Sequence, residues 1–166
     1  MLKRAAAAAT ILLLAAFAWM CWFMTAHGFS AREKPTALEA ALARRLRRLA
    51  SPPDAGSLKN PLAPTPLNIA EARDHFADHC AICHANDGSG KSQIGEGLYP
   101  PAPDMRQGST QDLTDGELFY IIKNGIRFTG MPGWGGDDEE NWQLVLFIRH
   151  LPQLSAKELE LMKEGK

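Results

Sequence analysis

The sequence lacks any convincing run of alternating apolar and polar residues, so no β-strand is predicted. It also lacks an internal repeat, and with 166 residues it is too short for two sizeable hydrophobic cores. Only three cysteines are present, and there is no second cysteine pair besides Cys80 and Cys83. These absences exclude sheet-based and repeat architectures. They leave one all-α domain with an appendage.

A large excess of one charge is also missing, since the net charge is −1. The two parts of the chain nevertheless differ. Residues 1–59 contain nine Lys and Arg against three Asp and Glu, a balance of +6, whereas residues 60–166 contain nine against sixteen, a balance of −7. The globular part is therefore acidic, which predicts protein partners with basic docking surfaces, and neither nucleic acid nor a nucleotide.

One long apolar run stands near the N-terminus. Residues Ala5 to Met24 carry no charge, and a helix of that length spans about 30 Å, the thickness of a bilayer's hydrocarbon core. Lys3 and Arg4 precede the run, and Trp19 and Trp22 lie near its far end. This pattern predicts a single transmembrane helix with a cytoplasmic N-terminus.

A cleaved signal peptide is the alternative interpretation, because residues 16–18, Ala-Phe-Ala, resemble a cleavage site. The run is longer than the usual apolar segment of a signal, and cleavage there would leave an exposed apolar tip. Arg32, Lys34 and Arg44 follow the run closely, so charge counting alone does not decide the orientation.

Two segments connect the run to the domain. Residues 35–50 have leucines at helical spacing and four arginines in the second half, which predicts a basic amphipathic helix. That helix would lie on an anionic membrane or an acidic partner, or would be a solvated stalk. Residues 51–66 contain five prolines, so we expect a semi-extended linker that lets the following domain swing.

Helix starts can be predicted in the second half of the chain from capping residues. Asn68, Thr114 and Ser155 are each followed three places later by Glu, and a further helix is expected to begin near Asp137 or Asp138. The segment between residues 86 and 111 is rich in Gly and Pro and is predicted to be loop.

The motif with the highest specificity is Cys80-Ala81-Ile82-Cys83-His84. A Cys-x-x-Cys-His sequence is typical of covalent haem c attachment. Two cysteines three residues apart on a helix present both sulfurs to one side, where each can form a thioether with the same macrocycle. His84 follows directly and is expected to bind the iron as the proximal ligand.

Other interpretations of this region are weaker. A structural zinc site needs four ligands and would have to recruit two of His75, His79 and His84. A redox dithiol expects a βαβ context, which is not predicted. Residues 85–92 resemble a phosphate-binding loop but lack the preceding strand, so their glycines are expected to fold tightly around one haem edge. Cys21 lies within the apolar run and is expected to be inert.

Met131 is the expected second axial ligand, because Gly130 and Pro132 fix it in a loop. Here the chain resembles class I cytochromes c over roughly residues 67–152. The resemblance is carried by the Cys-x-x-Cys-His motif, by Tyr-Pro-Pro-Ala-Pro-Asp at residues 99–104, by Lys-Asn-Gly-Ile at residues 123–126 and by Gly-Met-Pro before a last helix. Met105 is a rival ligand, at a position where the family usually has an apolar residue.

The resemblance implies further features of the site. A backbone carbonyl of Pro100 or Pro101 would accept a hydrogen bond from His84, and Trp134 would cover a haem edge. The helices near residues 69–83 and 138–150 would cross beside the haem. The expected core consists of Phe76, Leu98, Leu118, Ile121, Ile122, Trp142, Val145, Leu146 and Phe147.

The resemblance implies a domain of about four short helices around one covalent haem c, preceded by the transmembrane helix. We expect an anchor at residues 1–29, a basic helix and linker at 30–66 and the cytochrome domain at 67–166. The chain would be an electron carrier and not an enzyme. It would transfer single electrons on the outer face of the cytoplasmic membrane in a respiratory-type chain. The alternatives are a haem subunit of a larger membrane oxidoreductase and a haem enzyme with an open distal site.

Overall fold

The computed structural model describes residues 2–27 and 30–164, which form two compact units, Met1–Ala31 and Arg32–Lys166. The N-terminal unit is helix α1 (Leu2–His27). Its segment Lys3–Ala26 is long and apolar enough to cross a membrane, a criterion that a signal sequence also meets. The hydroxyl of Thr10 donates to the Ala6 carbonyl at 3.0 Å, and that of Thr25 to the Cys21 carbonyl at 3.0 Å. These polar groups are therefore satisfied within the helix, as an apolar surrounding requires.

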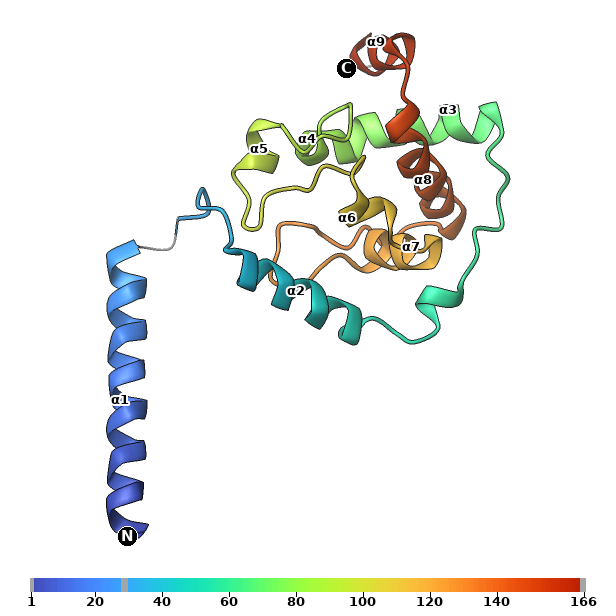
Figure 1. Ribbon diagram of the computed structural model, residues 1–166. Coiled ribbons are helices and arrows are strands. Elements are labelled where there is room, and N and C mark those ends of the chain that lie inside the picture. The colour runs from blue at the N-terminus through green and yellow to red at the C-terminus, as the bar shows by residue number, and fades with distance from the viewer. Residues whose placement is uncertain (1, 28–29, 165–166) are drawn as a thin grey trace. The chain divides into compact units, whose positions relative to one another are not determined.

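The second unit consists of helices and loops, and the described residues contain no strand, which confirms the all-α prediction (Figure 1). Three helices frame its core: α3 (Pro66–His75), α7 (Asp115–Asn124) and α8 (Asp138–His150). The remaining elements are α2 (Ala37–Ala50), η1 (Ala55–Ser57), η2 (Phe76–Cys80), α4 (Ala81–His84), α5 (Gln93–Glu96), α6 (Gly108–Gln111), η3 (Leu151–Gln153) and α9 (Ala156–Glu164).

Most helix starts agree with the capping signals. Thr114 caps α7 with a complete capping box to Glu117, and Asp137 caps α8. The prediction for Asn68 was wrong. Helix α3 begins at Pro66, and the side chain of Thr65 accepts a hydrogen bond from the Asn68 amide at 3.2 Å. Threonine followed by proline is the stronger signal, because proline at the first helical position has the helical φ already fixed.

The core lies where α3, η2 and α7 pack on α8. Helix α8 is buried on nearly all sides from Asn141 to Ile148, as its apolar composition predicts. The rings of Phe76 and Phe147 are fully buried, with centroids 5.1 Å apart, and Trp142 stacks on Phe119 at 4.2 Å. The expected core residues are buried, except that Leu98 and Ile121 are half-buried.

The Pro-rich segment is not a free linker over its whole length. Ala55 in η1 is buried against α7, and a Cβ placed on Gly116 would lie 1.9 Å from the Ala55 carbonyl oxygen. The Asn60 side chain donates to the Trp142 carbonyl at 2.9 Å. Prolines prevent regular hydrogen bonding in this segment, but they do not prevent it from packing on the domain. Residues 55–60 therefore belong to the folded unit and do not let it swing.

The C-terminal helix α9 is held to the domain. Met162 is fully buried in the core, and Nε2 of His150 on α8 lies 2.7 Å from Glu158. The Asn86 side chain, two residues after His84, donates to the Met162 carbonyl at 3.4 Å. Helix α9 thus covers the segment that follows the Cys-x-x-Cys-His motif.

Replacing Phe147 should destabilise the domain strongly. Phe147→Ala removes a fully buried ring that contacts Phe76, and such truncations cost about 3–5 kcal/mol of unfolding free energy. Urea unfolding of the full chain in detergent, followed by far-UV circular dichroism, measures this. Leu67→Ala is the control, because Leu67 is exposed on α3 and its loss should change the free energy by less than about 0.5 kcal/mol. Equal effects of both variants would contradict the packing described.

Candidate functional site

The motif residues lie where one helix changes its winding. Helix α3 continues into the π-helix η2, in which the amide of Ala81 donates to the carbonyl of Phe76, and then into α4. Cys80 is the last residue of η2, whereas Cys83 and His84 belong to α4. Both thiols are free and half-buried, and His84 is only 7% exposed. Single π-turns are frequent at functional sites, and this one sets the direction of the whole motif.

His84 has the properties of a neutral ligand. Burial lowers its pKa, although the nearby carbonyl of Pro103 acts in the opposite direction. The ring is therefore uncharged at neutral pH, and an uncharged imidazole has a lone pair for a metal. Its Nδ1 atom is buried without a hydrogen bond of normal geometry. Ligating histidines are usually oriented by a partner at the second ring nitrogen, and the Pro103 carbonyl is the group available for this.

The carbonyl near His84 in the structure is not the one expected from the sequence, and the expected hydrogen bond from His84 stays a prediction. The carbonyl that acts on the ring belongs to Pro103, and not to Pro100 or Pro101. Pro100 is exposed. The reason is the close approach of two loops at Gly90, where an added Cβ would lie 2.3 Å from the Ala102 carbonyl oxygen and 3.0 Å from that of Pro103. Gly90 also has a φ of +72°, which favours glycine.

The loop after the motif closes the C-terminal end of α4. The Ser92 hydroxyl donates to the carbonyls of Ile82 and Cys83 at 2.7 and 2.9 Å, and it accepts from the Gly95 amide at 2.9 Å. A Cβ on Gly95 would lie 2.0 Å from the Cys83 carbonyl oxygen, so only glycine fits there. The tight folding predicted for this loop is thus observed. A phosphate-binding loop would require a strand where helix α4 stands.

A salt-bridged cluster joins the two loops around His84. Arg106 donates through Nε to Asp104 at 2.8 Å and through Nη1 to Asp87 at 3.1 Å. Asp87 follows His84 by three residues, and Asp104 follows Pro103 directly. The Arg106 cluster (Asp87, Asp104, Arg106) therefore holds the carbonyl-bearing loop beside the motif.

The Met131 loop lies beside the motif. The Trp134 ring is 5.6 Å from the ring of His79, which directly precedes Cys80. The Trp134 amide donates to the Ile122 carbonyl at 3.1 Å, so the loop is also attached to α7. Met131 is half-buried, and its amide donates to the Thr129 hydroxyl at 3.1 Å. The structure thus brings the predicted site residues Cys80, Cys83, His84, Met131 and Trp134 into neighbouring segments.

Met105, the rival ligand, has a different setting. It is 8% exposed and belongs to the hydrophobic core. Its amide donates to the Gly88 carbonyl at 2.8 Å, and its carbonyl accepts from the Gln111 side chain at 2.7 Å. This setting favours packing as the function of Met105 and leaves Met131 as the candidate ligand.

The chemistry of the cysteines favours neither zinc nor a redox dithiol. Burial raises the pKa of Cys80 to about 12, and the charge of Cys83 adds to this effect. Redox-active cysteines have lowered pKa values instead. Within residues 2–27 and 30–164, no three His, Cys, Asp or Glu side chains come together as a metal site.

The residues present fit a covalent haem. They offer two free thiols, a neutral imidazole and a thioether on adjoining segments. These segments also carry large apolar side chains that the protein leaves exposed: Ile82, Ile94, Tyr99, Phe128 and Trp134. An apolar macrocycle covers such side chains, which a small soluble domain rarely leaves open without a function. A haem held there would supply an iron that exchanges one electron between its ferric and ferrous states.

The helical fold and the Cys-x-x-Cys-His segment are consistent with a class I c-type cytochrome domain at residues 67–148. Those residues match the family model described as cytochrome C oxidase, cbb3-type, subunit III. A comparison with curated proteins found no match. The cytochrome domain implies electron transfer by a haem protein.

Sequence reasoning missed several residues that build the site. These residues contact groups that are not their neighbours in the sequence, and no local sequence pattern predicts such contacts. They are Pro103, Ser92 and the Arg106 cluster. The His79–Trp134 contact was missed for the same reason. Ser92 and Asp87 lie in the stretch that was expected to fold tightly, and Pro103 and Asp104 end the Tyr-Pro-Pro-Ala-Pro-Asp stretch, but neither pattern predicts which groups they contact.

The two methionines can be separated by matched truncations. Met131→Ala should remove the thioether-to-iron charge-transfer band of the ferric holoprotein and lower its reduction potential on the order of 100 mV, within the range that axial ligands set. Met105→Ala should leave the charge-transfer band and the reduction potential unchanged. It should lower the unfolding free energy by about 2–5 kcal/mol, because Met105 is a core residue. Absorption spectra, redox titration and urea unfolding measure these effects. Loss of the band in Met105→Ala alone would reverse the assignment.

The Arg106 cluster should make part of the domain's stability pH-dependent. The hydrogen bond from Arg106 lowers the pKa of Asp104 to about 2, from an ordinary value of 3.8. A lowered pKa in the folded state stabilises the protein above about pH 4, and this contribution disappears as the pH falls towards 2. Wild type should therefore be more stable than Asp104→Asn at pH 5, with the difference shrinking towards pH 2.

Urea midpoints of the holoprotein at several pH values provide the measurement. Asp74→Asn is the matched control, since Asp74 is exposed and pairs only with its chain neighbour Arg73. A wild-type advantage that stays constant down to pH 2 would contradict the role given to Asp104.

Proposed function

We propose that this chain is a membrane-tethered monohaem cytochrome c that passes single electrons on the outer face of the cytoplasmic membrane, in a respiratory-type chain. The observation that carries the proposal is the setting of His84. It is a buried, neutral imidazole directly after two half-buried free cysteines, inside a cytochrome c domain. Helix α1 supports the tether, because its length and composition fit a single-pass anchor.

In this proposal, Cys80 and Cys83 hold one haem c covalently, and His84 and Met131 are its axial ligands. Trp134 and the exposed apolar side chains of the neighbouring segments exclude water from it. With two protein ligands in place, no coordination position is left for a substrate, so the chain is a carrier and not an enzyme. Its partners are redox proteins, and the acidic excess of residues 60–166 favours basic docking surfaces on them.

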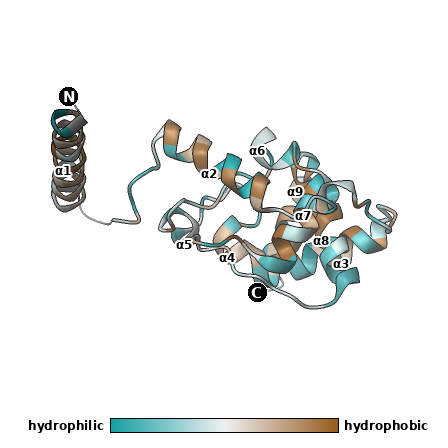
Figure 2. Ribbon diagram, turned by 90° about the horizontal axis from the view of Figure 1, so that it is seen from below, coloured by the Kyte–Doolittle hydropathy of each residue, from teal (hydrophilic) through white to brown (hydrophobic). Residues whose placement is uncertain are grey.

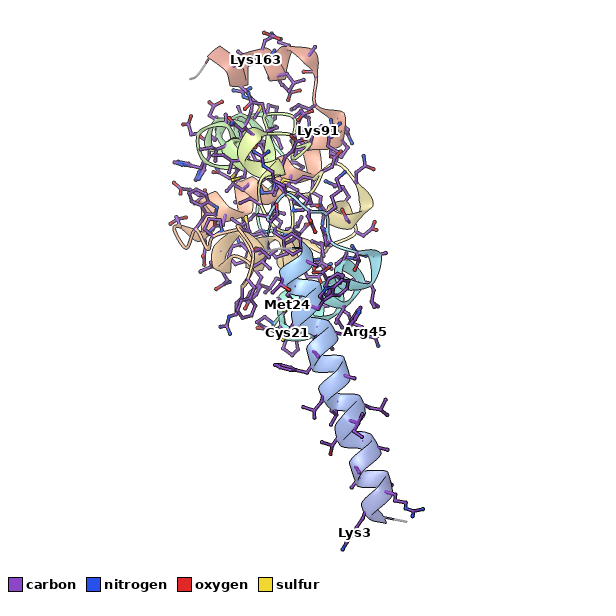
Figure 3. All side chains as sticks on the ribbon, turned by 90° about the vertical axis from the view of Figure 1, so that its left-hand side faces the viewer. Lys3, Cys21, Met24, Arg45, Lys91 and Lys163 are labelled. Carbon is purple, nitrogen blue, oxygen red and sulfur yellow. The ribbon has the colours of Figure 1, made fainter. Side chains whose placement is uncertain are left out.

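The side of the membrane follows from chemistry and not from charge counting. As the family resemblance implies, thioether attachment of haem takes place outside the cytoplasmic membrane, so the domain after α1 must be translocated. The N-terminal Lys3 and Arg4 then stay inside (Lys3 is labelled at the end of α1 in Figure 3).

The covalent attachment is tested with cysteine variants in a host competent for cytochrome maturation. Wild type should contain one haem per chain by pyridine haemochrome, and the haem should stay on the polypeptide in a denaturing gel. Cys80→Ala/Cys83→Ala should lose the gel signal completely. Cys21→Ala should keep it, because Cys21 lies on α1 in the other unit (Figure 3). A wild-type chain with the mass of the unmodified polypeptide would contradict the proposal. Rapid binding of cyanide to the ferric form would instead favour an enzyme with an open distal site.

A second candidate function is favoured by the family match. The matched family is described as subunit III of a cbb3-type cytochrome oxidase, so the chain could be the haem subunit of a larger membrane oxidoreductase. Native gel electrophoresis of membranes solubilised in mild detergent separates the two functions. A carrier should migrate alone, and a subunit should migrate with a high-mass complex.

A further inference from the structure

Helix α2 carries an uncovered leucine stripe. Four leucines of this helix are exposed, by 79, 55, 56 and 76% in sequence order: Leu38, Leu42, Leu46 and Leu49. Figure 2 shows α2 with separate brown and teal bands. Exposed leucines repeated along a whole helix face indicate a surface that binds something apolar.

The stripe faces away from the domain. The part-buried residues of α2 are Ala40 and Arg47, and they lie roughly opposite the leucines at 3.6 residues per turn. On that opposite side, Arg47 interacts with Glu117 of α7. The Tyr99 hydroxyl donates to Glu39 of α2 from the loop that leads to Pro103. Helix α2 is thus bonded to the domain through Glu39, and Glu117 attracts its Arg47, while its leucines remain uncovered.

The charges beside the stripe fit an anionic surface. Helix α2 contains four arginines against one glutamate. Around the helix, Arg45 lies next to the leucine stripe and Arg48 lies further round on the same side, whereas Arg44 lies towards the part-buried side of Ala40 and Arg47. Long arginine side chains at the border of an apolar stripe can reach headgroup phosphates while the leucines enter the acyl region. Figure 3 shows Arg45 at the edge of the second unit.

The sequence also keeps α2 close to a bilayer. Nine residues, 28–36, separate the last residue of α1, His27, from the first of α2, Ala37. At full extension this stretch reaches about 35 Å. If α1 is the anchor that the proposed function assumes, α2 cannot leave the neighbourhood of the membrane surface.

We propose that α2 lies in the surface of an anionic bilayer, with its leucine stripe in the acyl region and its arginines at the headgroups, and that it orients the haem domain on the membrane. This inference rests on the anchor of the proposed function. A protein surface or a second copy of this chain would be a different occupant of the stripe.

The test uses the full-length holoprotein with Cys21→Ala, in which an introduced cysteine is the only free thiol. A nitroxide is attached at Leu42→Cys or, as the control on the same helix, at Ala43→Cys, an exposed position off the stripe. A label at Leu13→Cys reports whether α1 is in the bilayer. Each protein is placed in nanodiscs, one copy per disc, of phosphatidylcholine alone or with phosphatidylglycerol. Power-saturation EPR compares accessibility to oxygen and to a water-soluble nickel complex.

In discs with phosphatidylglycerol, the label at position 42 should be accessible to oxygen and shielded from nickel, whereas the label at position 43 should be accessible to nickel. Replacing Arg45 and Arg48 by Gln should lower the equilibrium constant for surface binding about fivefold for each arginine. Nickel accessibility at position 42 in both lipids would overturn the inference and leave a protein as the occupant. If position 13 is also outside the bilayer, the anchor of the proposed function fails as well, so the two failures are distinguishable.

Discussion

The site depends on one constraint: a buried imidazole must be kept neutral and correctly aimed at the end of a short helix. Burial of His84 lowers its pKa, and the Pro103 carbonyl limits that shift. Every neighbouring element contributes to this setting. Ser92 closes α4, Gly90 lets the Pro103 loop approach, and the Arg106 cluster holds the two loops together. The imidazole that the proposed function makes an axial ligand is thus held by groups from three neighbouring segments.

The sequence could predict those features that local signals encode. Thr114 and Asp137 were recognised because a helix cap needs only residues within one turn, and the apolar sides of α8 imply burial wherever the helix lies. The Cys-x-x-Cys-His motif is equally local. Asn68 was misassigned because Thr65 and Pro66 form a competing signal three residues earlier. The prediction failed where two local signals overlapped.

The features that could not be predicted depend on which distant segments of the chain meet in the fold. The carbonyl near His84 belongs to Pro103 because two loops meet at Gly90, and no spacing rule locates such a meeting. Arg106 reaches Asp87 across 19 residues, and Asn60 reaches Trp142 across 82. The latter contact makes part of a proline-rich stretch a packed segment, although its composition is typical of a linker. Composition shows that regular structure is absent, whereas packing depends on the surface offered by the rest of the chain.

Two interactions of α2 link this helix to the segments around His84. Glu39 is bonded to Tyr99, and Tyr99 lies in the loop that ends at Pro103 beside His84. Arg47 interacts with α7, which also anchors the Trp134 amide. A surface that bound α2 as proposed would therefore orient the domain through the Glu39–Tyr99 bond and the attraction between Arg47 and Glu117. A cytochrome held in this way would still diffuse within the membrane plane, but it would present the same face to every partner, and orientation as well as charge would then limit the rate of electron transfer.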